Sequence, residues 1–126
     1  MACPHFRPRG PLLSWVNPPR VSLVEPCDGV CSRTGARPAE EILRESCNAG
    51  YARGRCALIS EDDPDAVCFT ISGGGEVLRQ VRFILEREHA PVETGWAVDA
   101  PPGSPLEAQA KAFLAAWRRR SRLHAR

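Results

Sequence analysis

Six cysteines are the side chains of this chain best suited to chemistry, and two of them, Cys47 and Cys56, frame the segment CNAGYARGRC. The others are Cys3, Cys27, Cys31 and Cys68. Thiolates bind zinc and iron–sulfur clusters. We find no apolar signal-peptide core and no stretch of roughly 18 apolar residues, so we expect a cytoplasmic protein without membrane contact, where thiols stay reduced. Crowded thiols in such a protein indicate a metal or cluster, with a disulfide framework as the alternative.

The spacing of the cysteines differs from the common metal and redox motifs. A zinc knuckle presents two sulfurs a few residues apart, and only Cys27 and Cys31, with three residues between them, are that close. Eight residues separate Cys47 from Cys56, and no C-x-x-C occurs. Distant single thiols can still converge on a [4Fe–4S] cluster, because each of its corners is ligated separately. The pattern favours such a cluster, with zinc in the same four-thiolate site as the alternative.

Polarity and position select four of the six thiols. Cys68 alternates with apolar residues in a strand-like segment and follows the acidic run EDDPD, whose charge would oppose a thiolate cluster. Cys27 and Cys31 compete for one position; we choose Cys31 and keep Cys27 as its replacement. The predicted metal ligands are Cys3, Cys31, Cys47 and Cys56, with His5 in reserve.

The residues inside CNAGYARGRC suit the surroundings of a negatively charged cluster. Its two glycines would let backbone N–H groups approach the sulfurs, and such hydrogen bonds tune a cluster's potential. Arg53 and Arg55 would offset the negative charge, and Tyr51 would cover the site from water. We therefore predict cofactor contacts from Tyr51, Arg53 and Arg55. The alternative is a glycine-rich turn with two buried structural thiols.

A single small α+β domain, residues 1–126, is expected to position these thiols. Six prolines in residues 1–35 exclude long helices and predict an irregular, cysteine-bearing arm that wraps over the rest of the domain. Pro38 at a first helical turn and Gly50 as a stop predict a short helix over 38–49.

A three-stranded antiparallel meander is predicted over 66–100. Apolar and polar residues alternate in 67–72, three glycines at 73–75 read as a hairpin turn, and 77–85 reads as a longer strand. A third strand, with Trp96 and Val98, is expected after a turn at Pro91.

The last element is an amphipathic helix over 105–122. Ser104-Pro105-Leu106-Glu107 is a capping box with proline at the first helical position. An apolar stripe at helical spacing follows and predicts packing on the sheet; it comprises Leu106, Ala110, Phe113, Leu114 and Trp117.

The chain has a net charge of +2, but its charged residues are distributed unevenly along the sequence. Residues 60–107 carry three arginines against ten acids, whereas residues 108–126 carry six cations and no acid. Four of these cations could contact nucleic acid; they are Arg118, Arg119, Arg120 and Arg122. A basic tail beside an acidic middle is as well explained by pairing within the chain, so a nucleic-acid partner is not favoured.

The chain resembles a group of small uncharacterised bacterial proteins with no known activity. The resemblance is carried by CPHF near the start, DGVC around Cys31, CNAGYARGRC, DAVCF and LEREHAPVETG, within residues 3–95. It implies that Cys3, Cys31, Cys47 and Cys56 are the recurring thiols of the group, whereas Cys27 and Cys68 fall where other residue types are usual.

We therefore expect a [4Fe–4S] protein with four cysteine ligands that serves redox chemistry, sensing or electron transfer, as an accessory to an unknown protein redox partner. The alternative is a zinc-stabilised nucleic-acid-binding or regulatory protein that uses the arginine-rich last helix. A thiol switch at Cys27 and Cys31 without metal is a third hypothesis. His89 beside Glu86 and Glu88 could form a base with an orienting acid, but common catalytic motifs are absent, and we do not expect catalysis.

Overall fold

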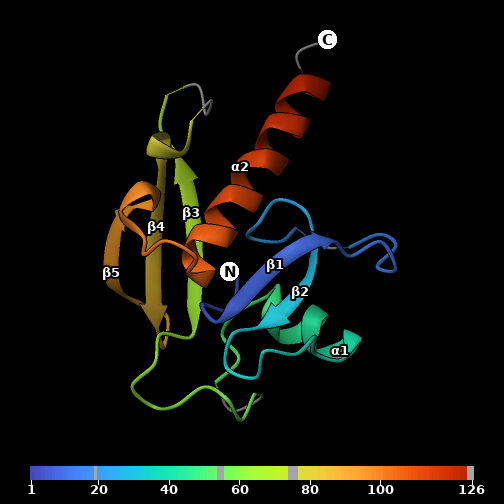
Figure 1. Ribbon diagram of the computed structural model, residues 1–126, viewed down its shortest axis with the longest axis vertical. Helices are drawn as coiled ribbons and strands as arrows, with labels where there is room; N and C mark the ends of the chain where they lie inside the picture. The colour runs from blue at the N-terminus through green and yellow to red at the C-terminus, as the bar shows by residue number, and fades with distance from the viewer. Residues whose placement is uncertain (19, 54–55, 74–76, 125–126) are drawn as a thin grey trace.

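Helix and sheet combine in an α+β fold, as predicted, with two antiparallel sheets and a long last helix (Figure 1). The computed structural model describes residues 1–18, 20–53, 56–73 and 77–124, with side chains as far as Ser121 in the last helix. The strands are β1 (Phe6–Pro11), β2 (Cys27–Cys31), β3 (Ala66–Ile71), β4 (Val81–Arg87) and β5 (Ala90–Trp96), and the α-helices are α1 (Glu40–Ile42) and α2 (Pro105–His124).

The proline-rich arm contains a sheet, so the prediction of an irregular segment over 1–35 is wrong in this respect. Strands β1 and β2 pair antiparallel, with a bulge between Pro8 and Gly10. Prolines are tolerated because β1 is an edge strand with β2 as its one partner in a two-stranded sheet. Gly29 lies opposite Pro8, where a Cβ would stand 2.1 Å from the carbonyl oxygen of Arg7. Glycine is therefore required for this close pairing.

The short helix covers fewer residues than the predicted 38–49. Helix α1 continues as a π-helical turn over Leu43–Cys47, in which the N–H of Asn48 donates to the carbonyl of Leu43 at 3.0 Å. Gly50 follows with a φ of 69°, a left-handed conformation that glycine adopts freely. The thiol of Cys47 is therefore presented where the chain leaves the helix.

The meander has the order β3-β4-β5, as predicted. Its second strand begins at Val81, because Leu78–Gln80 form a 3-10 turn. The turn before β5 is formed by Glu88 and His89, not around Pro91, and both have positive φ, at 52° and 66°. Positive φ at both central residues defines a type I′ hairpin turn, whose twist suits antiparallel strands. Of the predicted glycine turn at 73–75, only Gly73 belongs to the described residues.

Helix α2 lies between the meander and the β1–β2 sheet (Figure 1). At its start the N–H of Glu107 donates to the hydroxyl of Ser104 at 3.2 Å, and the carboxylate of Glu107 accepts from the N–H of Gly103 at 3.0 Å. Phe113 packs on the meander, with its ring centroid 5.6 Å from that of Phe69. The helix extends to His124, beyond the predicted end at residue 122.

Candidate metal centre

The four cysteines predicted as ligands line a single cavity of about 210 Å³. They come from four separate places: Cys3 precedes β1, Cys31 ends β2, Cys47 ends the π-helical turn, and Cys56 lies in the following loop. The geometry thus brings together thiols that are far apart in the sequence.

Backbone hydrogen bonds fix the segments that carry these thiols. The N–H of Cys3 donates to the carbonyl of Cys47 at 3.0 Å, which ties the two segments directly to each other. The β1–β2 pairing sets Phe6 opposite Cys31. Cys56 is held through its N–H, which donates to the carbonyl of the fully buried Ala52 at 2.8 Å. The positions of the four thiols therefore follow from the backbone, not from flexible side chains alone.

Two buried amide side chains brace this framework. Asn48 accepts from the N–H of Cys27 at 2.8 Å and donates to the carbonyls of Cys27 and Leu43, both at 2.9 Å. Gln109 of α2 donates to the carbonyls of Cys3 and Phe6, both at 2.7 Å. Since side-chain amides satisfy these buried backbone groups, Asn48 joins β2 to the turn before Cys47, and Gln109 joins α2 to the turn after Cys3.

The remainder of the cavity wall is mainly apolar. Phe6 is buried, Ile59 is half-buried, and the side chains of Ile42 and Leu58 are 45% and 41% exposed. Among the described residues, Arg37 is the one arginine or lysine in the lining, and its Nε donates to Asp28 at 2.8 Å. An apolar shell with a cation at its edge would favour a bound group of modest negative charge, because burial and nearby charge set a cluster's properties.

The two most deeply placed thiols of the cavity are poor nucleophiles. Burial, followed by the neighbouring sulfurs Cys31 and Cys56, raises the pKa of Cys3 to about 11. Burial, followed by the other three cysteines of the site, raises the pKa of Cys47 to about 12. Reactive redox thiols have lowered pKa values. A metal that binds such thiols must displace their protons.

The four cysteines share the lining of one cavity, without the closer approach that a single ion would need. Within the described parts of the chain, no three His, Cys, Asp or Glu side chains lie close enough together to hold a single metal ion. A metal or cluster at the cavity therefore stays a prediction.

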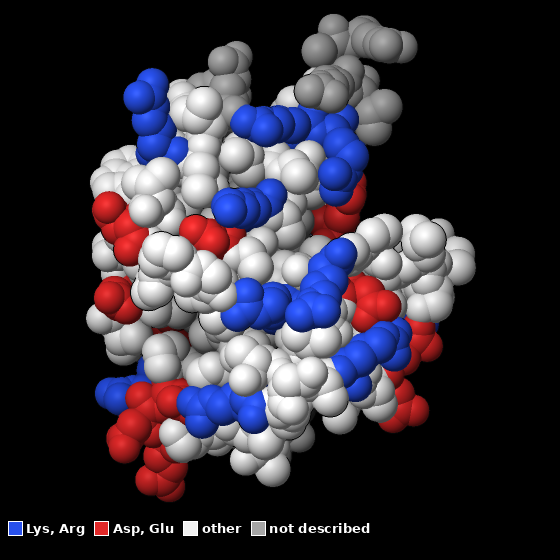
Figure 2. All heavy atoms as spheres, viewed as in Figure 1, with Lys and Arg blue, Asp and Glu red and all other residues white. Residues whose placement is uncertain are grey.

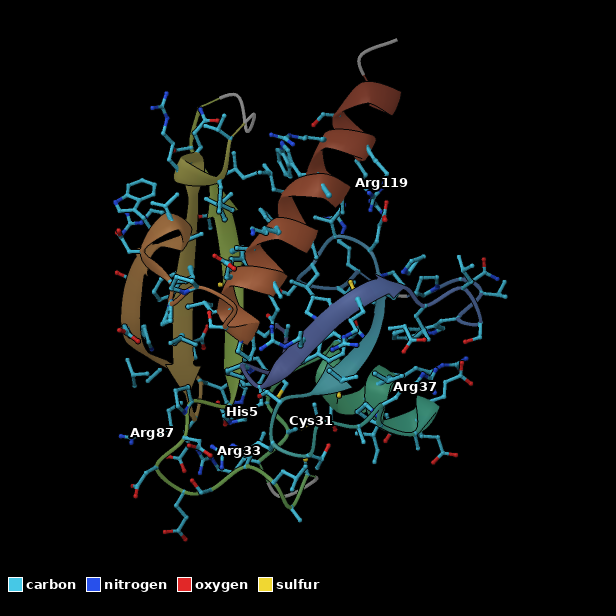
Figure 3. All side chains as sticks on the ribbon, in the orientation of Figure 1. His5, Cys31, Arg33, Arg37, Arg87 and Arg119 are labelled. Carbon is cyan, nitrogen blue, oxygen red and sulfur yellow. The ribbon has the colours of Figure 1, made fainter. Side chains whose placement is uncertain are left out.

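His5, the reserve ligand, lines the cavity but is engaged by charged neighbours. Its Nε2 lies 3.3 Å from the guanidinium of Arg33 and 3.6 Å from the carboxylate of Asp63. Burial and the charge of Arg33 lower the pKa of His5, although Asp63 opposes that shift. Figure 3 shows His5, Cys31 and Arg33 gathered at the same end of the β1–β2 sheet.

Tyr51 and Arg53, predicted to contact the cofactor, are not among the residues that line the cavity. Tyr51 has a φ of 52°, its ring stacks on His89 at 4.1 Å, and its hydroxyl donates to Glu86 at 2.8 Å. Burial and the bond to Glu86 raise the pKa of Tyr51 to about 12. The ring thus lies against the β4–β5 hairpin, and its predicted contact with a cofactor stays a prediction.

Arg53 organises the acidic loop that precedes β3. It donates to the carboxylate of Asp65 at 3.3 Å and to the carbonyl of Asp63 at 2.8 Å, and it also reaches the carbonyls of Ser60 and Glu61. The guanidinium of Arg53 is therefore engaged by the carboxylate and carbonyl oxygens of this loop. Arg55 lies outside the described residues, so its predicted role stays a prediction.

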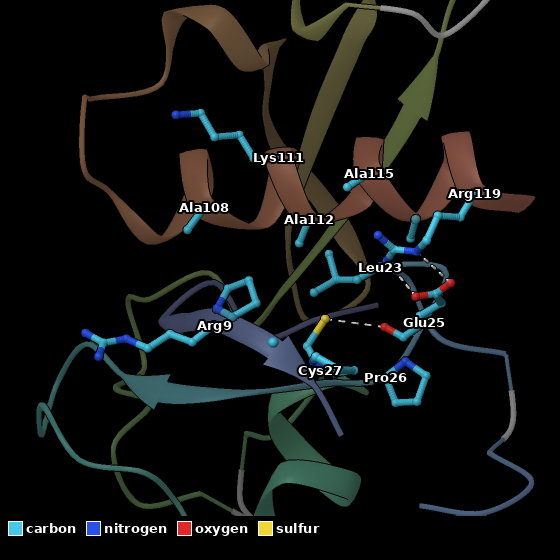
Figure 4. Close-up of a pocket in the computed structure, with 14 residues that line it drawn as sticks. Arg9, Leu23, Glu25, Pro26, Cys27, Ala108, Lys111, Ala112, Ala115 and Arg119 are labelled. Atoms are coloured by element: carbon cyan, nitrogen blue, oxygen red, sulfur yellow. Dashed lines mark hydrogen bonds and ion pairs between the residues drawn. The ribbon is translucent and has the colours of Figure 1, made fainter. Parts of the chain in front are cut away.

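The two cysteines left out of the quartet lie elsewhere. Cys68 of β3 is half-buried between the buried Val67 and Phe69, as alternation predicts. Cys27 lines a separate groove of about 500 Å³ between β1 and α2, where its thiol donates to the carbonyl of Glu25 at 3.4 Å (Figure 4). Because Cys27 and Cys31 stand at opposite ends of β2, they do not support a thiol switch between them.

The basic end of α2 is partly neutralised by the chain itself. Arg119 makes two contacts with Glu25, at 3.3 and 2.7 Å (Figure 4). Arg118 and Arg120 are exposed, and the side chain of Arg122 lies outside the described residues.

Sequence reasoning missed the apolar wall and Arg37. The residues Ile42, Leu58 and Ile59 lie close to predicted ligands in the sequence, so proximity was an available signal. Nothing in the spacing of Arg37 indicated that it reaches the cavity, because its direction depends on the ion pair with Asp28.

Comparison of the chain with protein-family models, curated proteins and solved structures finds no match. The resemblance to the bacterial group therefore stays a prediction. Over the described residues, we find no helix that combines the length and apolar character needed to cross a bilayer.

Proposed function

We propose that the protein binds a [4Fe–4S] cluster through Cys3, Cys31, Cys47 and Cys56 and acts in redox chemistry, sensing or electron transfer. The observation that carries the proposal is the convergence of these four thiols on one mainly apolar cavity. Since thiolate ligation requires reduced cysteines, we also propose that the protein is cytoplasmic.

The size of the cavity favours a cluster over a single zinc ion. With zinc–sulfur bonds of about 2.3 Å, a tetrahedral site brings its sulfurs to about 3.8 Å from one another and leaves no void between them. Here the four cysteines, together with other lining residues, border a cavity of about 210 Å³. A cubane, whose corners carry separate ligands, makes use of such a space.

The surroundings suit a redox group. A bound cluster would supply one-electron chemistry, with a potential set by charge, hydrogen bonding and solvent exposure. Phe6 and Ile59 would limit access of water, and Arg37 would partly balance the negative charge. Ile42 and Leu58 are partly exposed where they line the cavity. We propose that a protein redox partner makes contact there, over the small area typical of transient electron-transfer encounters.

Anaerobic purification followed by iron and sulfide analysis tests the proposal. The expected sample is brown, absorbs near about 400 nm, and contains four irons and four sulfides per chain. Cys3→Ser and Cys47→Ser are expected to lose the chromophore. Cys68→Ser is the matched control, because Cys68 lies outside the cavity, and it is expected to retain the chromophore.

Two other results would overturn the cluster. A colourless protein with one equivalent of zinc, lost in Cys47→Ser, would assign the same thiols to zinc. A metal-free protein after reconstitution, with all six thiols open to titration, would remove both metals from consideration.

A further inference from the structure

A hollow of about 440 Å³ lies between the C-terminal half of α2 and the loop that precedes β2. Its walls include Val21, Val24 and Phe113, with Trp117 and two arginines, Arg20 and Arg120. Its volume falls within the range of about 300–1,000 Å³ that is typical of small-ligand sites. None of the thiols lines it, so it is separate from the proposed cluster site.

Trp117 differs from the other two tryptophans in what covers its ring. Arg44 lies over Trp15 at 5.5 Å, and Arg82 lies over Trp96 at 5.1 Å. Within the described part of the chain, no cation covers Trp117, and its ring lies beside that of Phe113 with centroids 6.2 Å apart. Its side chain is 40% exposed. Trp117 therefore presents aromatic surface to the hollow, next to the two arginines.

The charge of the hollow is entirely positive. Arg20 and Arg120 line it, and no carboxylate of the described residues does. Glu25 lies near enough for the charge of Arg120 to help lower its pKa, but hydrogen bonding to Arg119 is the main cause of that shift. Both oxygens of Glu25 already contact Arg119, and among the described ion pairs neither Arg20 nor Arg120 takes part. Figure 2 shows basic side chains on this end of the molecule, toward the C-terminus of α2.

The loop that forms the second wall is held in shape. Val24 has a φ of 71°, a conformation that a β-branched residue rarely adopts unless its surroundings impose it. Its N–H donates to the carbonyl of Val21 at 3.1 Å, and the hydroxyl of Ser22 donates to the carbonyl of Val67 at 3.2 Å. The wall is thus pre-formed, which lowers the entropic cost of binding.

We propose that this hollow binds a nucleotide unit, with the base stacked on Trp117 and the phosphate held by Arg20 and Arg120. Aromatic stacking combined with arginine contacts is the way proteins bind single-stranded nucleic acid without reading its sequence. A free mononucleotide offers the same base and phosphate. The site does not depend on the cluster, so either function can exist without the other.

Fluorescence anisotropy with a labelled oligothymidine of about 12 nucleotides tests the proposal. Trp117→Ala is expected to weaken binding about 5- to 150-fold, the range that corresponds to loss of one stacked base. Trp96→Ala is the matched control, since Trp96 is 39% exposed and also lies beside an arginine. It is expected to leave the affinity unchanged.

Two further measurements separate stacking and charge from general effects on folding. Arg20→Ala and Arg120→Ala are exposed-site changes, and each is expected to lower the slope of log K against log salt by about 0.7. Competition by millimolar mononucleotide would identify a free nucleotide as a ligand, whereas competition by unlabelled single strand alone would identify the strand.

Absence of binding at low salt would overturn the proposal, as would equal losses in Trp117→Ala and Trp96→Ala or unchanged salt slopes in both arginine variants. Iron and sulfide contents of the same preparations report on the cluster independently. A failure of nucleotide binding would therefore be distinct from a failure of the proposed function.

Discussion

Replacement of Asn48 by alanine is expected to destabilise the fold strongly. The side chain of Asn48 is 1% exposed and makes three hydrogen bonds, to the N–H and carbonyl of Cys27 and to the carbonyl of Leu43. A hydrogen bond contributes about 1 kcal/mol net, and buried partners left unsatisfied add to the loss. Asn48→Ala should therefore lower the free energy of unfolding by about 3–4 kcal/mol, a large part of the roughly 5–15 kcal/mol that stabilises a domain.

Urea denaturation followed by circular dichroism measures this change. The midpoint should fall with little change in the slope of free energy against urea, since the folded structure buries the same surface. Thr34→Ala is the control, because Thr34 accepts one exposed hydrogen bond from the N–H of Ala36; it should change stability by less than about 0.5 kcal/mol. Asn48→Asp should be at least as damaging as Asn48→Ala, because a carboxylate cannot donate to the two carbonyls. A loss below about 1 kcal/mol in Asn48→Ala would refute the role of Asn48 as a brace.

Two further predictions concern the same framework. Gln109→Leu removes two buried hydrogen bonds at 2.7 Å and should lower the free energy of unfolding by about 2 kcal/mol. Thermal denaturation measures this loss, with Lys111→Leu, an exposed change on the same helix, as the control. Equal melting temperatures of the two variants would contradict the prediction. Burial raises the pKa of Cys27 from 9.0 to about 11. At pH 8 its thiolate fraction is therefore about 100-fold lower than that of an unshifted thiol. Since the thiolate is the nucleophile, the rate of alkylation of Cys27 should rise about tenfold per pH unit up to about pH 10. Peptide-resolved mass spectrometry of iodoacetamide labelling measures this rate, and a plateau near pH 9 would contradict the raised pKa.

Local sequence signals were enough to predict the last helix and the meander. The capping residues Ser104 and Glu107 act within one turn, and alternation in β3 reports directly which side chains are buried. The pairing of β1 with β2 could not be predicted in this way, because a proline-rich strand pairs with a segment many residues away across a loop. Prolines argue against strands in general, and an edge position is visible only in the folded chain.

In the candidate site, too, the sequence predicts what local signals determine and not what tertiary contacts determine. The choice of the four thiols followed from polarity and spacing, and the structure brings these four to one cavity. Tyr51 and Arg53 do not line that cavity: the ring of Tyr51 stacks on His89, and Arg53 contacts Asp65. Such contacts depend on tertiary partners, so adjacency to a ligand in the sequence does not predict adjacency in space.

Helix α2 packs against both sheets, so we expect their unfolding to be coupled. Gln109 contacts the segment beside β1, and Phe113 contacts β3 one turn later. A two-stranded sheet has little stability of its own, so the β1–β2 pair depends on this helix for its order. We expect the amides around Ala110–Leu114 to be among the slowest to exchange with deuterium, and the two sheets to lose their protection together, as one cooperative unit.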